Sequence, residues 1–74
     1  MERRLYKELW RLRFEKMLRL EEESVTDYQA LLEECKTKYK SHTLIPHFER
    51  LITDEKKHAH LCKELLTILN RQPD

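Results

Sequence analysis

The sequence predicts an all-α protein: an antiparallel two-helix hairpin that dimerises into a four-helix bundle. The 74 residues contain no glycine, and the only prolines are Pro46 and Pro73. Apolar residues recur every three or four positions over two long segments, which is the spacing of a helix seam. β-branched residues are few and never alternate in a run, so no strand is expected. We expect a single domain, residues 1–74, because a chain this short buries one small core.

The two expected helices cover about residues 2–38 and about 43–70, with a turn at about 39–42. A connection that short makes the helices antiparallel neighbours. Ser41 and Thr43 are candidate N-caps, and Pro46 falls in the first helical turn, where its missing N–H costs nothing. The first helix is the longer one, so its basic, aromatic start at residues 3–11 should overhang the bundle. We expect this segment to mediate contacts between dimers; a membrane-surface role is the alternative.

Two apolar stripes run along each helix, and together they are wider than one partner helix can cover. The first stripe consists of Trp10, Phe14, Met17, Glu21, Ser24, Tyr28, Leu31 and Cys35, and in the second helix of Phe48, Leu51, Glu55, His58, Cys62, Leu65 and Leu69. The second stripe consists of Leu18, Val25, Leu32 and Tyr39, with Ile45, Ile52, Ala59 and Leu66. We therefore expect a homodimer at minimum, built around a two-fold axis, and a higher homo-oligomer beyond it.

Three positions of the first stripe hold metal-ligand residues: Glu21, Glu55 and His58. At about 1.5 Å of rise per residue, Glu21 lies roughly 25 Å from the turn, and Glu55 and His58 lie roughly 18 and 22 Å from it. The three side chains can therefore meet near one level. A buried charge needs a partner, so a divalent cation is the expected one. We take these three residues as candidate metal ligands and candidate catalytic residues.

This ligand set is half of that in carboxylate-bridged di-metal bundles, where one helix supplies a Glu and the next supplies Glu-x-x-His. Two chains would complete the set with four Glu and two His. Carboxylate and imidazole ligands suit iron, manganese or zinc, and redox chemistry favours iron, two ions per dimer. Manganese or zinc in the same site, without ferroxidase activity, is a narrower alternative.

The segment Asp54-Glu55-Lys56-Lys57-His58-Ala59 resembles the second-helix motif of the ferritin-like superfamily, shared by bacterioferritins and rubrerythrins. Glu21 followed by Tyr28 resembles the Glu…Tyr pair of the first helix in those families, and the resemblance covers about residues 17–70. Those proteins carry two copies of the ligand set in one chain. Because this chain has one copy, it is similar to the two-helix encapsulated ferritins.

That resemblance implies a ferroxidase that oxidises Fe(II) with O₂ at a site shared across the dimer, for iron storage inside an encapsulin shell. It implies that Glu21, Glu55 and His58 are the ligands and that Tyr28 lies next to them in the second shell. One departure is that no shell-docking peptide is visible after Arg71, so either the sequence is truncated or this member is not shell cargo.

Composition argues against several other partners. Residues 1–20 carry seven Lys and Arg against three Glu, and residues 21–74 carry eight against eleven acids, so the whole chain is at +1 and nucleic acid is not expected as a partner. No stretch approaches the roughly 20 apolar residues of a membrane span, and no signal peptide is evident. Cys35 and Cys62 would lie too far apart in a hairpin for a disulfide. A cytoplasmic location is expected, within an encapsulin compartment if a shell exists.

Less specific interpretations of the same residues stay open. Glu55 and His58 can be an ordinary surface pair, and Glu21 can be a solvated member of the acidic run at residues 21–23. His42, His47 and His60 are expected at the surface. The competing hypothesis for the whole chain is a structural helical-hairpin adaptor without metal, in which the acids of the seam pair with Lys or Arg of a partner chain.

Overall fold

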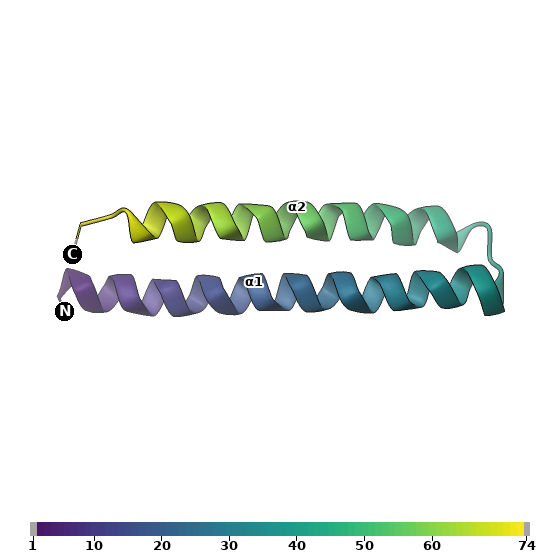
Figure 1. The fold of residues 1–74 in the computed structure, drawn as a ribbon, viewed down its shortest axis with the longest axis horizontal. Coiled ribbons are helices and arrows are strands. Elements are labelled where there is room, and N and C mark those ends of the chain that lie inside the picture. The colour runs from purple at the N-terminus through teal and green to yellow at the C-terminus, as the bar shows by residue number, and fades with distance from the viewer. Residues whose placement is uncertain (1, 74) are drawn as a thin grey trace.

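The computed structural model describes residues 2–73 and shows two antiparallel helices lying side by side (Figure 1). Helix α1 spans Arg3–Glu34, one π-helical turn, η1, spans Cys35–Tyr39, and helix α2 spans Leu44–Asn70. The backbone measures 54 × 14 × 12 Å, and the two ends of the described chain lie at the same end of the hairpin. The all-α hairpin is confirmed, whereas pairing with a second copy stays a prediction. Met1 and Asp74, the outermost residues of the expected domain, lie outside the described residues.

The turn departs from the expected continuation of the first helix to residue 38. The N–H of Lys40 donates to the carbonyl of Cys35 at 2.6 Å, which widens the last turn into η1. Lys40 then adopts the left-handed conformation with φ of 54°. A non-glycine residue pays roughly 1–2 kcal/mol for that conformation, and the chain offers no glycine. The side chain of Ser41 caps the start of α2, because its Oγ accepts the N–H of Leu44 at 3.2 Å. Thr43, directly before the helix, makes no such bond.

The basic start of α1 does not overhang the hairpin, so that expectation is wrong. Arg3 Nε donates to the carbonyl of Pro73 at 2.9 Å, and Lys7 Nζ donates to the carbonyl of Gln72 at 2.7 Å. The reason is the tail after α2: three residues beyond the helix can extend roughly 10 Å, which compensates for the shorter second helix. The start of α1 is therefore held against the end of the chain.

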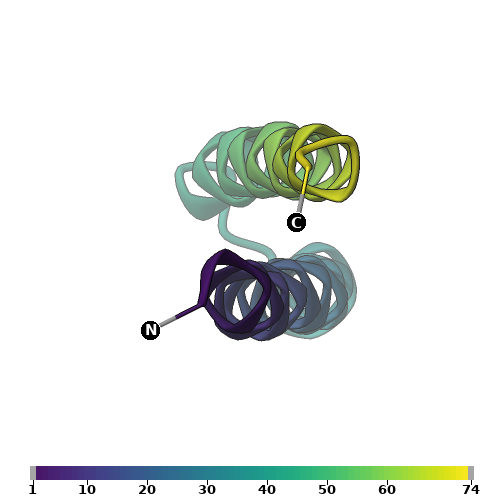
Figure 2. The ribbon, with the colours of Figure 1, turned by 90° about the vertical axis from the view of Figure 1, so that its left-hand side faces the viewer.

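Packing between the two helices divides the apolar stripes in an unexpected way. Most of the second stripe lies between the helices, where Ile52 and Ala59 are buried, although Tyr39 at its end is 75% exposed. The first stripe is split: Cys35 and Cys62 are buried, whereas the positions at seven-residue spacing on its outer edge are exposed, except for the half-buried Ser24. In an end view, two helices lie against each other with nothing on either side of the pair (Figure 2).

The hairpin thus has two different uncovered faces. The apolar face carries exposed side chains at seven-residue spacing on both helices: Trp10, Met17, Leu31, Leu44, Leu51 and Leu65. Leu31 and Leu44 line the same hollow, which places these two series on one side of the molecule. The polar face, on the opposite side, carries a hollow lined mainly by Glu22, Thr26, Lys56, His60 and Lys63. Rows of exposed apolar side chains of this length are typical of an oligomerisation surface.

Within residues 2–73, neither helix contains a stretch long and apolar enough to cross a membrane.

Candidate metal centre

Glu21 in the middle of α1 meets Glu55 and His58 in the middle of α2. One ligand atom from each of the three residues lies within 4.8 Å of the others. His58 Nδ1 is 3.8 Å from Glu21 Oε2 and 3.9 Å from Glu55 Oε1. These distances are too long for hydrogen bonds. The two His58 distances suit ligand atoms around an ion, because two atoms that are each about 2.0–2.2 Å from one metal lie up to roughly 4.4 Å apart.

Burial of the three side chains is graded. The exposed fractions are 20% for Glu55, 27% for Glu21 and 55% for His58. Glu21 Oε2 is buried and has no hydrogen-bond partner within the part of the chain that the structure describes. A buried carboxylate oxygen without a partner is costly, and a bound cation would remove that cost. The Glu21, Glu55 and His58 cluster can therefore hold a metal ion.

Electrostatics at the cluster favour a proton or a cation between the carboxyl groups. The nearby carboxyl group of Glu21, which would hydrogen-bond a protonated Glu55, is the largest cause that raises the pKa of Glu55; burial and the charge of Glu21 add to it, and His58 opposes it. Two carboxyl groups this close share a proton more readily than both ionise. Burial, followed by the charge of Glu21, also raises the pKa of the Cys62 thiol. Cys62 is therefore a neutral thiol beside the cluster.

The remaining candidates lie elsewhere or make no contact with the cluster. Tyr28 is half-buried two turns from Glu21, and within residues 2–73 its hydroxyl makes no hydrogen bond to the three ligands. Its place beside the ligands stays a prediction. His60 pairs with Glu64 at 3.0 Å, and His42 and His47 are exposed near the turn. No fourth His, Cys, Asp or Glu in the described chain joins the cluster.

Sequence reasoning found the three residues but missed how the cluster opens. It treated the whole first stripe as inward, whereas His58 shares the edge position of Leu51 and Leu65, seven residues away on either side. His58 is consequently exposed toward the apolar face. The signal was present in the sequence: two stripes on one helix cannot both face a single neighbour.

Comparison with known proteins finds no family model, no curated protein and no solved structure that matches this chain. What is shown is a two-helix antiparallel hairpin with a possible metal-binding group, without a family assignment.

Proposed function

We propose that the protein is a di-iron ferroxidase whose site is shared by two copies of the chain. The observation that carries the proposal is the Glu21, Glu55 and His58 cluster, with ligand atoms within 4.8 Å and a buried, unpartnered oxygen. The cluster opens onto the apolar face through His58. A second copy on that face would both cover the apolar side chains and close the site.

One chain supplies too few ligands for a closed site. Three ligands leave one or more coordination positions open on any metal of this class. Two chains supply four Glu and two His, enough for two ions with bridging carboxylates. In this arrangement the two copies of Glu21, Glu55 and His58 would hold the two ions, with Glu55 as the carboxylate available to both. Iron binds the deprotonated form of Glu55, so the raised pKa of this carboxyl group should make iron binding depend on pH.

The chemistry needs two irons because O₂ accepts electrons in pairs most easily. Oxidation of two Fe(II) ions releases two electrons, which together with two protons reduce one O₂ to H₂O₂. Anionic carboxylate oxygens stabilise the more highly charged Fe(III) product relative to Fe(II). The apolar side chains around the cluster would restrict water and strengthen these charge interactions.

The resemblance to ferritin-like proteins supports the same proposal. Residues 54–59 and the Glu21…Tyr28 pair carry it, and the hairpin has the two-helix form of encapsulated ferritins. A bundle of this size encloses no storage cavity, so the oxidised iron would need a container. An encapsulin shell is the proposed container, and a larger homo-oligomer inside it is the proposed assembly.

The proposal is tested by O₂ consumption on addition of Fe(II) to the wild-type protein and to three variants. Glu55→Ala and His58→Ala should remove the rapid phase, whereas His60→Ala on the polar face should retain it. Circular dichroism checks that all variants stay helical. Rapid oxidation that survives in both site variants would sink the ferroxidase proposal.

The second candidate is a helical-hairpin adaptor without metal. It is favoured by the length of the apolar face, which runs from Trp10 to Leu31 and so extends well beyond the three-residue cluster. An adaptor should become more stable when Glu55 is replaced by leucine, since a packed apolar residue replaces a poorly partnered acid. A ferroxidase should instead lose its iron-dependent stabilisation in Glu55→Leu.

A further inference from the structure

We infer that the second copy lies head to tail on the apolar face, so that Trp10 of each copy fills a hollow beside the turn of the other. The two-fold axis then crosses the helices at the level of Glu21. This inference rests on the proposed function, since it identifies the partner surface that completes the same site. Beyond the proposed function, it gives the orientation of the two copies: the turn of each hairpin lies beside the open end of the other.

Two alternative arrangements of a dimer can bring the clusters of its two hairpins together face to face. If the two-fold axis runs along the helices, each turn lies beside the other turn. If the axis crosses the helices, each turn lies beside the open end of the partner. Both arrangements keep the two clusters adjacent, so the cluster alone does not choose between them.

The distribution of charge along the hairpin favours the arrangement in which the axis crosses the helices. The half of the hairpin near the turn, residues 21–55, has nine carboxylates against four Lys and Arg, a net charge of −5. The open half, residues 2–20 and 56–73, has eleven Lys and Arg against four carboxylates, a net charge of +7. The change of sign falls at Glu21 in α1 and after Glu55 in α2, which is the level of the cluster. A two-fold axis that crosses the helices there places each basic half against the acidic half of the partner. An axis that runs along the helices places basic against basic and acidic against acidic.

Nothing inside one hairpin accounts for this distribution of charge. The basic half of α1 lies beside the basic half of α2, because Arg3 contacts Pro73 and Glu21 contacts His58. Along α1 itself, the cations gather toward the N-terminus and the acids toward the C-terminus, which opposes the preference of the helix dipole. The net charge of each half is thus left without a complement in the hairpin, and a second copy laid head to tail would supply one.

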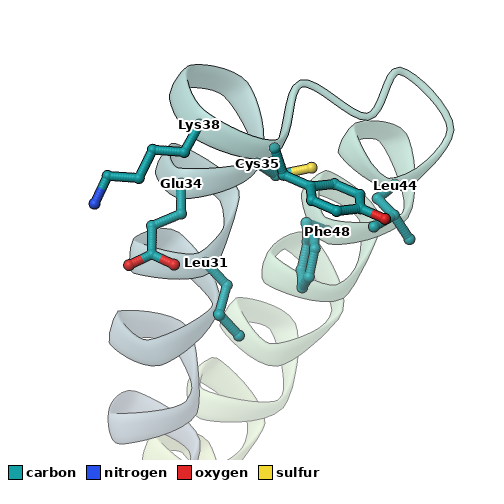
Figure 3. A pocket seen from close by; sticks show the side chains of 7 residues that line it. Leu31, Glu34, Cys35, Lys38, Leu44 and Phe48 are labelled. Atoms are coloured by element: carbon teal, nitrogen blue, oxygen red, sulfur yellow. The ribbon is translucent and has the colours of Figure 1, made fainter.

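Shape agrees with charge. A hollow of about 500 Å³ lies between α1 and α2 beside the turn, lined by Leu31, Cys35, Leu44 and Phe48. Figure 3 shows Leu31, Cys35 and Phe48 toward the space between the helices and Leu44 at the start of α2, with the charged ends of Glu34 and Lys38 directed away from them. The hollow is thus apolar inside and charged at its border, which suits a large aromatic side chain from a partner.

Trp10 is the side chain at the matching height. It is 47% exposed and is held by an edge-to-face contact with Phe14, with ring centroids 5.6 Å apart. Trp10 lies 11 residues before Glu21 and Leu31 lies 10 residues after it, or roughly 16 and 15 Å along the helix. A two-fold axis crossing at Glu21 therefore brings the partner's Trp10 to the level of Leu31.

Lysine cross-linking of the unmodified protein distinguishes the two dimers. Lys7 and Lys38 are 31 residues apart, roughly 46 Å within one hairpin, so a linker of less than half that reach joins them only between copies. An equal mixture of ¹⁴N and ¹⁵N chains identifies such links by mass spectrometry. The inference predicts Lys7–Lys38 links between copies. Links of Lys7 to Lys7 and of Lys38 to Lys38 would overturn it.

A matched pair of variants tests the role of Trp10. Trp10→Ala should raise the dimer dissociation constant by at least about tenfold, as expected for a buried aromatic anchor. Leu12→Ala should change it by less than about threefold, because Leu12 is similarly exposed but lies roughly 200° further round α1. Equal effects of the two substitutions would contradict the assignment of Trp10 to the hollow.

Added salt should weaken the dimer in the crossed arrangement and strengthen it in the parallel one.

The outcome is separable from that of the proposed function. Lys7–Lys38 links in a protein that does not oxidise iron would support the head-to-tail dimer and remove the ferroxidase. Homotypic links in an active protein would do the reverse. A chain that stays monomeric at high concentration would overturn both.

Discussion

The apolar face and the polar face of this hairpin use the same residue types in different ways. On the polar face, His60 pairs with Glu64 one turn further along α2 at 3.0 Å, in contact with water. Beside the apolar face, His58 lies 3.8 and 3.9 Å from two carboxylates on different helices, one of which has a buried oxygen without a partner. The first pair is complete within its own helix, and the second group is not. The difference indicates that buried polar atoms without hydrogen-bond partners, rather than the presence of His and Glu, mark the candidate site.

Metal binding should give the largest contrast between the faces. Glu55→Ala or His58→Ala removes one of three ligands and should lower affinity for Fe(II) or Zn(II) by more than about 100-fold, since even residues behind the ligands cost 10–100-fold. His60→Ala on the polar face should leave affinity unchanged. Isothermal titration calorimetry under anaerobic conditions measures both. Equal losses in the two histidine variants would remove the distinction between the faces.

Self-association should show the next largest contrast. Leu51→Gln places an amide in the expected dimer interface, where an unpartnered polar group costs about 1–3 kcal/mol. The substitution occurs twice in a dimer, so the dissociation constant should rise by at least about tenfold. Lys63→Gln on the polar face should have an effect within about 0.5 kcal/mol. Sedimentation equilibrium provides the constants, and a dimer insensitive to Leu51→Gln would show that the apolar face is not the interface.

The pH dependence of stability should change sign when metal binds. In the metal-free protein the raised pKa of Glu55 favours its protonated form in the fold. That contribution is present at low pH and is lost as the pH rises above the ordinary carboxyl pKa, through the raised value. Metal requires the deprotonated form, so metal-dependent stabilisation should grow over the same pH range.

Thermal unfolding with and without Zn(II), between about pH 4 and 7, measures both trends. Glu55→Gln is the control, because it keeps the shape of the side chain and removes the proton. A wild-type protein whose metal-free stability depends on pH no differently from Glu55→Gln would contradict the shared proton.

The smallest effect should come from the backbone of the turn. Lys40→Gly relieves the left-handed backbone at φ of 54° and should raise the free energy of unfolding by about 1 kcal/mol. Lys38→Gly, two residues earlier in η1, should instead lower it by about 0.5–1 kcal/mol. Chemical denaturation measures both changes. Neither substitution should alter metal affinity, and a change there would mean that the turn influences the site.

The hairpin and the three-residue cluster could be predicted from sequence because both follow from helical geometry. A spacing of three and four fixes the helices, and the rise per residue brings Glu21 level with Glu55 and His58. The division of the stripes was not predictable in the same way. Whether Ile52 or Leu51 faces α1 depends on the angle at which two helices pack, and the sequence contains apolar residues at both positions.

The ends of the hairpin were beyond sequence reasoning for a different reason. Arg3 and Lys7 donate to backbone carbonyls of the tail, and every residue type offers such a carbonyl. The widening at η1 likewise depends on a backbone bond from Lys40 to Cys35. Side-chain identity does not encode which backbone carbonyl accepts either bond, so the pattern of residues suggested an overhang that the structure does not have.

The central claim is that two copies of the chain jointly form one two-iron site. An anaerobic Fe(II) titration followed by native mass spectrometry tests it most directly, because mass reports the oligomer and the bound metal together. The account predicts dimers that carry two irons and monomers that carry none. Iron bound to isolated monomers with the same affinity, or dimers that bind no iron, would contradict it.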